Sequence, residues 1–189
     1  MTAFWIALFF VLIAEMGDKT QLVALAFATR YRTITVITGV FGATLLVHLF
    51  SVALGEVAGL ALPVFWINLL AGVSFIGFGL WTLRGDDLDE GKIKEGRFGP
   101  LATVGVTFFL AELGDKTMLA TITIASQQHS FVGVWLGSTV GMVIADGLAI
   151  IVGRVLGKRL PEKPIKYGAA LIFLASGVFT LVQAFRHQQ

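Results

Sequence analysis

A charged motif stands inside an apolar stretch that is long enough to cross a membrane. The stretch runs from Ala3 to Ala28 and is mostly Phe, Trp, Ile, Leu, Val and Ala, yet residues 14–21 read AEMGDKTQ. The motif recurs as AELGDKTM at residues 111–118. A charge at the centre of a membrane costs at least about 2.5 kcal/mol, so its duplication indicates a function. The alternative is a buried ion network that only fixes the register of the helices.

The composition is that of a protein that crosses the membrane several times. Hydrophobic residues make up 56% of the 189 residues, charged residues only 14%, and the mean hydropathy is +0.85, which excludes an ordinary soluble domain. The chain has no cysteine, which excludes disulfides, thiolate metal sites and cysteine nucleophiles. No basic region precedes the first apolar stretch, so we expect no cleavable signal peptide.

Six apolar stretches have the length of about 20 residues that a helix needs to cross a membrane. We therefore predict an all-α integral membrane protein with six transmembrane helices. The predicted helices cover residues 3–29, 33–55, 64–83, 100–126, 131–156 and 165–185. The charged segment 84–99 between the third and fourth helices is interpreted as a solvated linker. A regulatory cation site in this linker is the alternative, although the spacing of its acids fits no EF-hand loop. These acids are Asp86, Asp87, Asp89 and Glu90.

The two halves of the chain are repeats of each other. Residues 1–83 form the first three-helix repeat, residues 84–99 the linker, and residues 100–189 the second repeat. An offset of 98 aligns several glycines and prolines, among them Gly39 with Gly137, Gly55 with Gly153, Pro63 with Pro161 and Gly79 with Gly177. Because each repeat has an odd number of helices, the second enters the membrane from the opposite side. Such inverted repeats are typical of secondary transporters.

The basic residues predict the orientation of the chain. In the six-helix arrangement only Arg186 lies on one side of the membrane, and the other basic residues of the loops lie on the opposite side. These are Arg30, Arg32, Arg84, Lys92, Lys94, Arg97, Arg154, Lys158, Arg159, Lys163 and Lys166. By the positive-inside rule, both termini lie outside and the 84–99 loop is cytoplasmic.

Each copy of the motif has two carboxylates three residues apart, a spacing that puts both on one face of a helix. The pseudo-twofold axis of inverted repeats brings the two copies together near the midplane of the membrane, so all four carboxylates could surround one point. They are Glu15 and Asp18 in the first copy and Glu112 and Asp115 in the second.

Two further positions of the motif suit the same site. The glycines between the carboxylates, Gly17 and Gly114, permit either close approach of another helix or local unwinding that frees backbone carbonyls. The threonines that follow, Thr20 and Thr117, add hydroxyl groups.

The charges of the motifs predict a divalent cation as cargo. Four carboxylates and two lysines sum to −2, and carboxylates without cysteine suit hard cations such as Ca²⁺, Mg²⁺ or Mn²⁺. Lys19 and Lys116 cannot bind a metal while protonated, so we interpret them as counter-ions that restrain the carboxylates. Protons compete with the metal, because burial and like-charge crowding favour protonated carboxylates. Competition and alternating access together make an antiporter.

The sequences EMGDKT and ELGDKT resemble the paired E-x-G-D-[KR]-[TS] motifs of the Gdt-type and MneA-type divalent-cation transporter family, and the resemblance covers essentially the whole chain. It implies cation/proton exchange, with manganese export in bacterial members and Ca²⁺ and Mn²⁺ transport in Golgi members. It also implies that both intact motifs carry the family's site. The short chain is similar to bacterial members, which implies the inner membrane. The site residues so implied are Glu15, Asp18, Lys19, Thr20, Glu112, Asp115, Lys116 and Thr117.

Four residues outside this set are further candidates. Gln21 and Met118 occupy the same position after each motif, where both could bind the metal. A thioether at Met118 would favour Mn²⁺ over Ca²⁺, and the alternative is that it fills a packing gap. Asp146 aligns with His48, and we predict a proton or ion relay for Asp146. His48 is either titratable or a hydrogen-bonded packing residue.

Small residues recur every four positions on the second and fifth predicted helices. Such stripes permit close packing of helices and would also let one bundle rock against another. One stripe is Gly133, Gly137, Gly141, Ala145, Ala149, Gly153 and Gly157, and its counterpart is Gly39, Ala43, Val47, Ser51, Gly55 and Gly59.

Other functions stay open at this point. An intramembrane aspartyl protease is disfavoured, because Glu replaces the first Gly of the G-x-G-D protease motif in both copies. A Ca²⁺/H⁺ antiporter, or an exporter of a small organic cation such as lysine, is an alternative to Mn²⁺ export. We expect no enzymatic activity, no cofactor and no nucleic-acid partner. The expected partners are the metal ion, protons and the lipid bilayer, and a homo-oligomer stays open.

Overall fold

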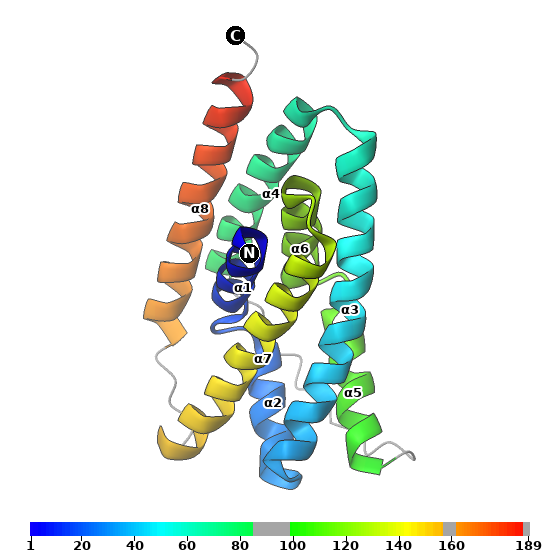
Figure 1. Cartoon of the computed structure of the whole chain (residues 1–189). Coiled ribbons are helices and arrows are strands. Elements are labelled where there is room, and N and C mark those ends of the chain that lie inside the picture. The colour runs from blue at the N-terminus through cyan, green and yellow to red at the C-terminus, as the bar shows by residue number, and fades with distance from the viewer. Residues whose placement is uncertain (85–98, 157–161, 187–189) are drawn as a thin grey trace.

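The computed structural model is all helical in the part of the chain that it describes, residues 1–84, 99–156 and 162–186 (Figure 1). Within these ranges it describes all side chains except those of residues 19, 153–156, 162, 165 and 166. The predicted linker and the side chain of Lys19 therefore lie outside the described residues. The helices are α1 (Thr2–Glu15), α2 (Lys19–Arg30), α3 (Thr33–Ala61), α4 (Val64–Arg84), α5 (Gly99–Glu112), α6 (Lys116–Gln128), α7 (Phe131–Leu156) and α8 (Glu162–Arg186).

Four helices of the described residues are long and apolar enough to cross a membrane, namely 33–61, 64–84, 131–152 and 167–186. Their outward faces are apolar too, as the exposed Leu46, Phe50 and Leu54 of α3 show. A helix that is apolar all round suits a lipid environment. These four helices coincide with the second, third, fifth and sixth predicted spans.

The first and fourth predicted spans, 3–29 and 100–126, are each divided into two helices. Each break falls at the glycine of the motif, where φ is +79° at Gly17 and +78° at Gly114. Glycine adopts this left-handed conformation without steric cost. Of the two roles left open for these glycines, local unwinding is the one that the structure shows at both. Close approach of another helix is excluded at Gly114, where an added Cβ would meet no atom within 4 Å.

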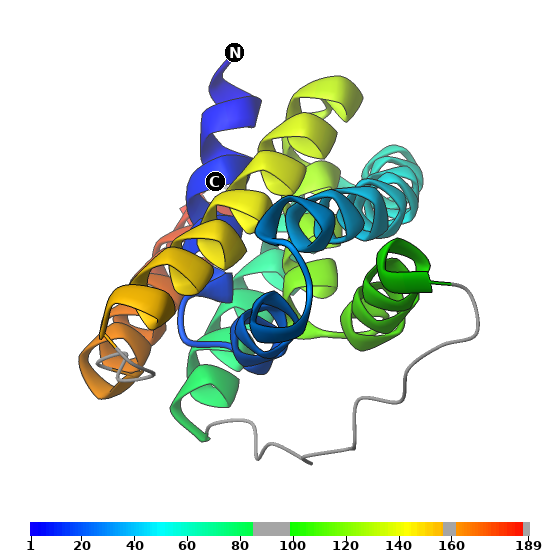
Figure 2. The same cartoon turned by 90° about the horizontal axis from the view of Figure 1, so that it is seen from below.

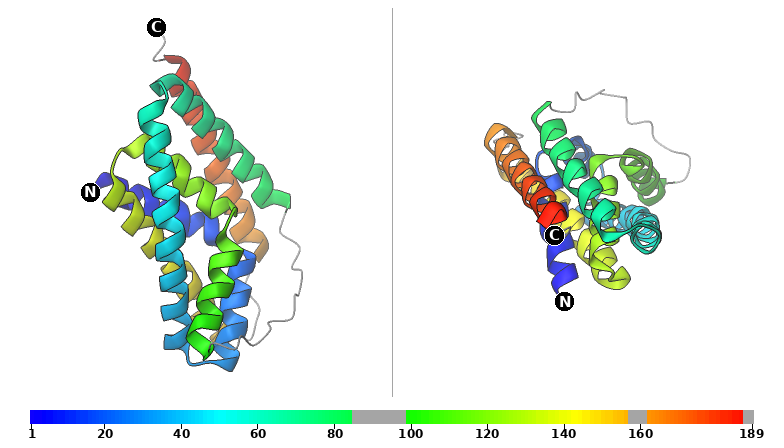
Figure 3. Two further views of the ribbon diagram at one scale, coloured as in Figure 1. Left: turned by 90° about the vertical axis from the view of Figure 1, so that its right-hand side faces the viewer. Right: turned by 90° about the horizontal axis from the view of Figure 1, so that it is seen from above.

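Each broken helix pair packs against the long helix of the other half. Helix α3 lies along α5 and α6, α7 lies along α1 and α2, and α4 pairs with α8 (Figures 1 and 3). Glycines permit the close contacts: a Cβ on Gly55 would come within 2.4 Å of the Ile122 carbonyl oxygen, and one on Gly137 within 2.3 Å of the Phe4 carbonyl oxygen. The prediction that the small-residue stripes serve close packing is confirmed at these positions.

Connections between helices lie at two opposite ends of the bundle. The α2–α3 connection and the start of α5 lie at the lower end of Figure 1, and the α3–α4 connection and the end of α8 lie at the upper end. Seen from the lower end, α2 stands among α3, α5 and α7 (Figure 2). The glycines of both breaks are exposed, whereas the carboxylates on either side of them, such as Glu15 and Asp18, are buried.

Candidate cation site

Glu15 accepts hydrogen bonds from residues that follow both helix breaks. It is the last residue of α1 and its side chain is fully buried. One carboxylate oxygen accepts a hydrogen bond from the hydroxyl of Thr20 in α2, and the other accepts one from the hydroxyl of Thr117 in α6, at 3.2 Å. Hydroxyl groups from both halves of the chain thus converge on one carboxylate.

An ion pair also crosses between the halves. The Nζ atom of Lys116, the first residue of α6, lies 3.2 Å from Oδ1 of Asp18 in the first break, and both side chains are buried. The predicted pairing of Lys116 with a carboxylate is confirmed. Its partner comes from the other motif, which the order of residues within one motif could not reveal.

Glu112 occupies the position in the second motif that Glu15 occupies in the first, but its environment differs. It is the last residue of α5 and is fully buried, yet among the described residues neither of its carboxylate oxygens has a hydrogen-bond partner. The charges of Glu15, Asp18 and Asp115 act on it, as does that of Asp146. The two motif glutamates therefore differ: Glu15 accepts two side-chain hydrogen bonds, and Glu112 accepts none from the described residues.

The helix ends favour a cation beside the glutamates. Glu15 and Glu112 end α1 and α5, and the C-terminal end of a helix carries partial negative charge. Asp18 and Asp115 precede the starts of α2 and α6, and Asp115 accepts a hydrogen bond from the backbone N–H of Thr117 at 3.5 Å. Discontinuous helices with this polarity form the ion sites of several transporter folds.

Gln21 and Met118 stabilise the breaks in this conformation. The backbone N–H of Gly17 donates to Oε1 of Gln21 at 2.8 Å, and that of Gly114 donates to Sδ of Met118 at 3.3 Å. Gln21 also donates through Nε2 to the carbonyl oxygen of Ala145 in α7, at 3.0 Å. Both residues were predicted as metal ligands, and a metal would first have to displace these contacts.

Asp146 and His48 are both buried, but only Asp146 follows a residue that contacts a motif. Among the described residues, neither side chain has a hydrogen-bond partner. Asp146 follows Ala145, whose carbonyl oxygen binds Gln21 of the first motif, whereas no hydrogen bond links His48 or its chain neighbours to either motif among the described residues. The predicted equivalence of the two residues in depth thus does not extend to a shared role at the motifs.

The four motif carboxylates do not surround one point in this conformation. Within residues 1–84, 99–156 and 162–186, no three Asp, Glu or His side chains lie close enough together to hold a metal ion. The site of four carboxylates therefore stays a prediction. In the broken helices, threonines bind Glu15 and a lysine binds Asp18.

Comparison with known proteins identifies the family. The family model described as "Divalent cation/proton antiporter GDT1" matches residues 3–90 and 100–188, nearly the whole chain. This chain belongs to the GDT1 family. The GDT1 family is one of transporters, in agreement with the expectation that the chain is not an enzyme, and the resemblance seen in the motifs is confirmed.

Several GDT1-type relatives cover most of the chain. A Vibrio cholerae protein named "Putative manganese exporter" is 34% identical over 182 residues, 95% of this chain and 90% of that protein. GDT1-like protein sll0615 of Synechocystis is 29% identical over 92% of this chain and 93% of its own length. Protein PAM71, chloroplastic, of Arabidopsis thaliana is 31% identical over 94% of this chain, which spans 56% of that protein. No solved structure matches the chain.

Proposed function

We propose that this protein exports Mn²⁺ from the cell in exchange for protons, by alternating access through one site built from both halves. The observation that carries the proposal is the pair of hydroxyl groups on Glu15, one from each half of the chain. One composite site also fits the charge, because four carboxylates and two lysines sum to −2 and balance one divalent ion.

The buried carboxylates supply the exchange chemistry. Glu15 and Glu112 end two half-helices whose negative ends favour a cation, and hard divalent ions prefer carboxylate and hydroxyl oxygens. Mn²⁺ displaces hydrogen bonds to Glu15 and draws in Glu112. When the metal leaves, protons neutralise these carboxylates, because an isolated buried charge is costly. Asp146 follows Ala145, whose carbonyl oxygen accepts a hydrogen bond from Gln21 beside the first break, and it is the proposed proton relay.

Mn²⁺ is the proposed cargo because a relative that matches 95% of this chain is named a manganese exporter. Ca²⁺ is the second candidate, since the family description specifies only a divalent cation and the oxygen ligands suit both ions. Transport of an organic cation such as lysine is disfavoured, because the family's members are described as carrying divalent cations.

The proposed architecture has six spans in two inverted repeats, with each broken pair, α1–α2 and α5–α6, acting as one span. The separate family matches to residues 3–90 and 100–188 support this division, as does the reciprocal packing of each broken pair on the other half's long helix. The positive-inside rule supports a cytoplasmic linker and external termini, and the bacterial relative supports the inner membrane as the location.

The test is metal flux into liposomes that contain the purified protein and a pH indicator. We expect Mn²⁺ movement to be coupled to opposite proton movement, with Ca²⁺, Mg²⁺ and lysine compared in parallel. Acidifying the side from which the metal loads should inhibit flux, because protons compete for the same carboxylates. Flux that is indifferent to an imposed pH gradient would indicate a channel or uniporter.

Two variants test the composite site. Glu15→Gln and Glu112→Gln should each abolish both flux and the same high-affinity binding of Mn²⁺. Glu56→Gln is the matched control, because Glu56 is a partly exposed carboxylate of α3 outside the motifs, and it should retain both. If each motif variant instead retains half of the bound Mn²⁺, the protein has two independent sites.

A further inference from the structure

Two interfaces at equivalent positions of the repeats differ in the structure. In the first, α7 packs tightly on α1: a Cβ on Gly141 would come within 2.6 Å of the Leu8 carbonyl oxygen. The equivalent interface joins α3 and α5 and is less extensive. Gly39, the equivalent of Gly137, is tightly packed there, but at the exposed edge of the interface a Cβ on Gly42 would meet no atom within 4 Å, and one on Gly105 would meet only the Gly39 carbonyl oxygen, at 3.7 Å.

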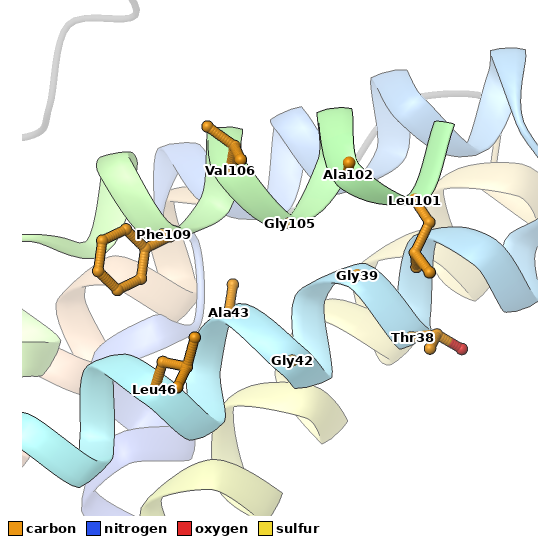
Figure 4. Close-up of a pocket in the computed structure, with 10 residues that line it drawn as sticks. All are labelled: Thr38, Gly39, Gly42, Ala43, Leu46, Leu101, Ala102, Gly105, Val106 and Phe109. Carbon is orange, nitrogen blue, oxygen red and sulfur yellow. The ribbon is translucent and has the colours of Figure 1, made fainter. Parts of the chain in front are cut away.

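An open groove of about 550 Å³ runs along the edge of this interface. Figure 4 shows it between α3 and α5, with Ala43 and Leu46 on one side and Leu101 and Phe109 on the other. Helix α5 keeps close contact with α3 beside the groove, because a Cβ on Gly39 would meet the Val104 side chain at 2.7 Å. The small residues on both helices would permit the rest of the interface to close as tightly as α1 on α7.

The hydrogen bonds of the site have the same asymmetry. Thr20 and Thr117 are equivalent residues, and so are Glu15 and Glu112, but both hydroxyl groups donate to Glu15. Glu112 is fully buried and has no partner among the described residues. An exchange of roles between the halves would give Glu112 both hydroxyl groups and leave Glu15 with neither.

The symmetry itself is kept where the long helices meet. The hydroxyl oxygen of Thr44 in α3 lies 3.4 Å from Sδ of Met142 in α7, and these two residues are equivalent at the offset of 98. Equivalent residues touch only near a symmetry axis. The difference between the halves therefore lies in the broken helices and their packing.

We infer that the structure is one of two symmetry-related states, and that α5 closes on α3 in the other while α1 separates from α7 and both threonines move to Glu112. The inference rests on the proposed inverted-repeat transport. It names the interfaces that move and the hydrogen bonds that change with them. A two-state transporter requires the two states to lie close in free energy.

Distances between spin labels, measured by pulsed electron resonance in lipid nanodiscs, test the inference. The chain has no cysteine, so labels can be placed without removing any. Leu46 and Val106 report on the α3–α5 interface. The equivalent residues on α7–α1 are Ile144, at the offset of 98 from Leu46, and Phe9, at the offset of 97 between the two motifs from Val106. All four side chains are exposed. Metal-free protein should show two distances for each pair, and conditions that populate the shorter Leu46–Val106 distance should populate the longer Phe9–Ile144 distance.

Substitutions of the two glutamates should shift these populations in opposite directions. Glu15→Leu removes the acceptor of two hydrogen bonds in the observed state. It should therefore increase the fraction of molecules that have the shorter Leu46–Val106 distance. Glu112→Leu removes the buried carboxylate that has no partner among the described residues, and it should decrease the fraction of molecules with the shorter Leu46–Val106 distance. We expect each to change the population ratio about tenfold, equivalent to about 1.4 kcal/mol.

A filled groove gives a second, independent test. Gly42→Leu occupies open space in the observed state but blocks closure, so the shorter Leu46–Val106 distance should disappear. Gly77→Leu is the matched control, because Gly77 in α4 also has no atom within 4 Å of an added Cβ, and it should leave both distances unchanged.

A single distance for each pair in wild type and all variants would overturn the inference, as would shifts of both pairs in the same direction. These measurements use no metal. They therefore stand even if flux assays refute Mn²⁺ as cargo, and Mn²⁺/proton exchange without opposite distance changes would refute only this inference.

Discussion

Replacing Gly114 with alanine tests whether the second helix break is imposed by glycine. An added Cβ at Gly114 meets no atom within 4 Å, so the substitution has no steric clash with neighbours. Its backbone φ of +78° is left-handed, and holding an L-residue there costs about 1–2 kcal/mol. Gly114→Ala should therefore destabilise the protein by about that amount.

Gly77→Ala is the matched control for this prediction. Gly77 lies inside the continuous helix α4, and its added Cβ is also free of contacts. There alanine should stabilise the helix by about 0.5–1 kcal/mol, because glycine loses more backbone entropy on folding. The same chemical change should thus have opposite signs at the two glycines, and the two variants should differ by about 2 kcal/mol.

The assay is equilibrium unfolding of both variants and wild type in mixed micelles, with Mn²⁺ flux measured on the same preparations. We expect Gly114→Ala to reduce flux as well, because a straightened helix would turn Asp115 away from its cap on Thr117. If Gly114→Ala is as stabilising as Gly77→Ala, the break does not depend on the left-handed glycine and the reasoning is refuted.

Two further predictions concern contacts around the breaks. Lys116→Met should destabilise the protein by removing the buried ion pair with Asp18. In unfolding experiments, the double variant with Asp18→Asn should lose less than the sum of the two single losses, and strictly additive losses would contradict the pairing. Gln21→Leu removes two hydrogen bonds and should lower the free energy of unfolding by about 1–3 kcal/mol. Met118→Leu removes one weak sulfur contact and should lower it less. Equal losses of stability in the same assay would argue against the hydrogen bond from Gln21 to α7.

Much of the fold could be predicted from the sequence, because hydropathy and charge are local properties. Four apolar stretches form continuous helices close to their predicted ranges. The two stretches with the motif contain breaks instead, and the glycine between charged residues was the visible sign of them. The choice between close packing and unwinding could not be made from Gly17 and Gly114 alone, since glycine serves both and the neighbouring helices decide.

The candidate site, like the fold, has features that the sequence predicts and features that only the structure shows. The sequence by itself determined that the charged residues are duplicated within apolar stretches and suit a hard divalent cation, because residue type and spacing carry that information. Only the tertiary structure decided that Thr117 binds Glu15, that Lys116 pairs with Asp18 and that Glu112 has no partner among the described residues. The motifs EMGDKT and ELGDKT are almost identical, so a difference between their glutamates arises only from how the surrounding helices pack.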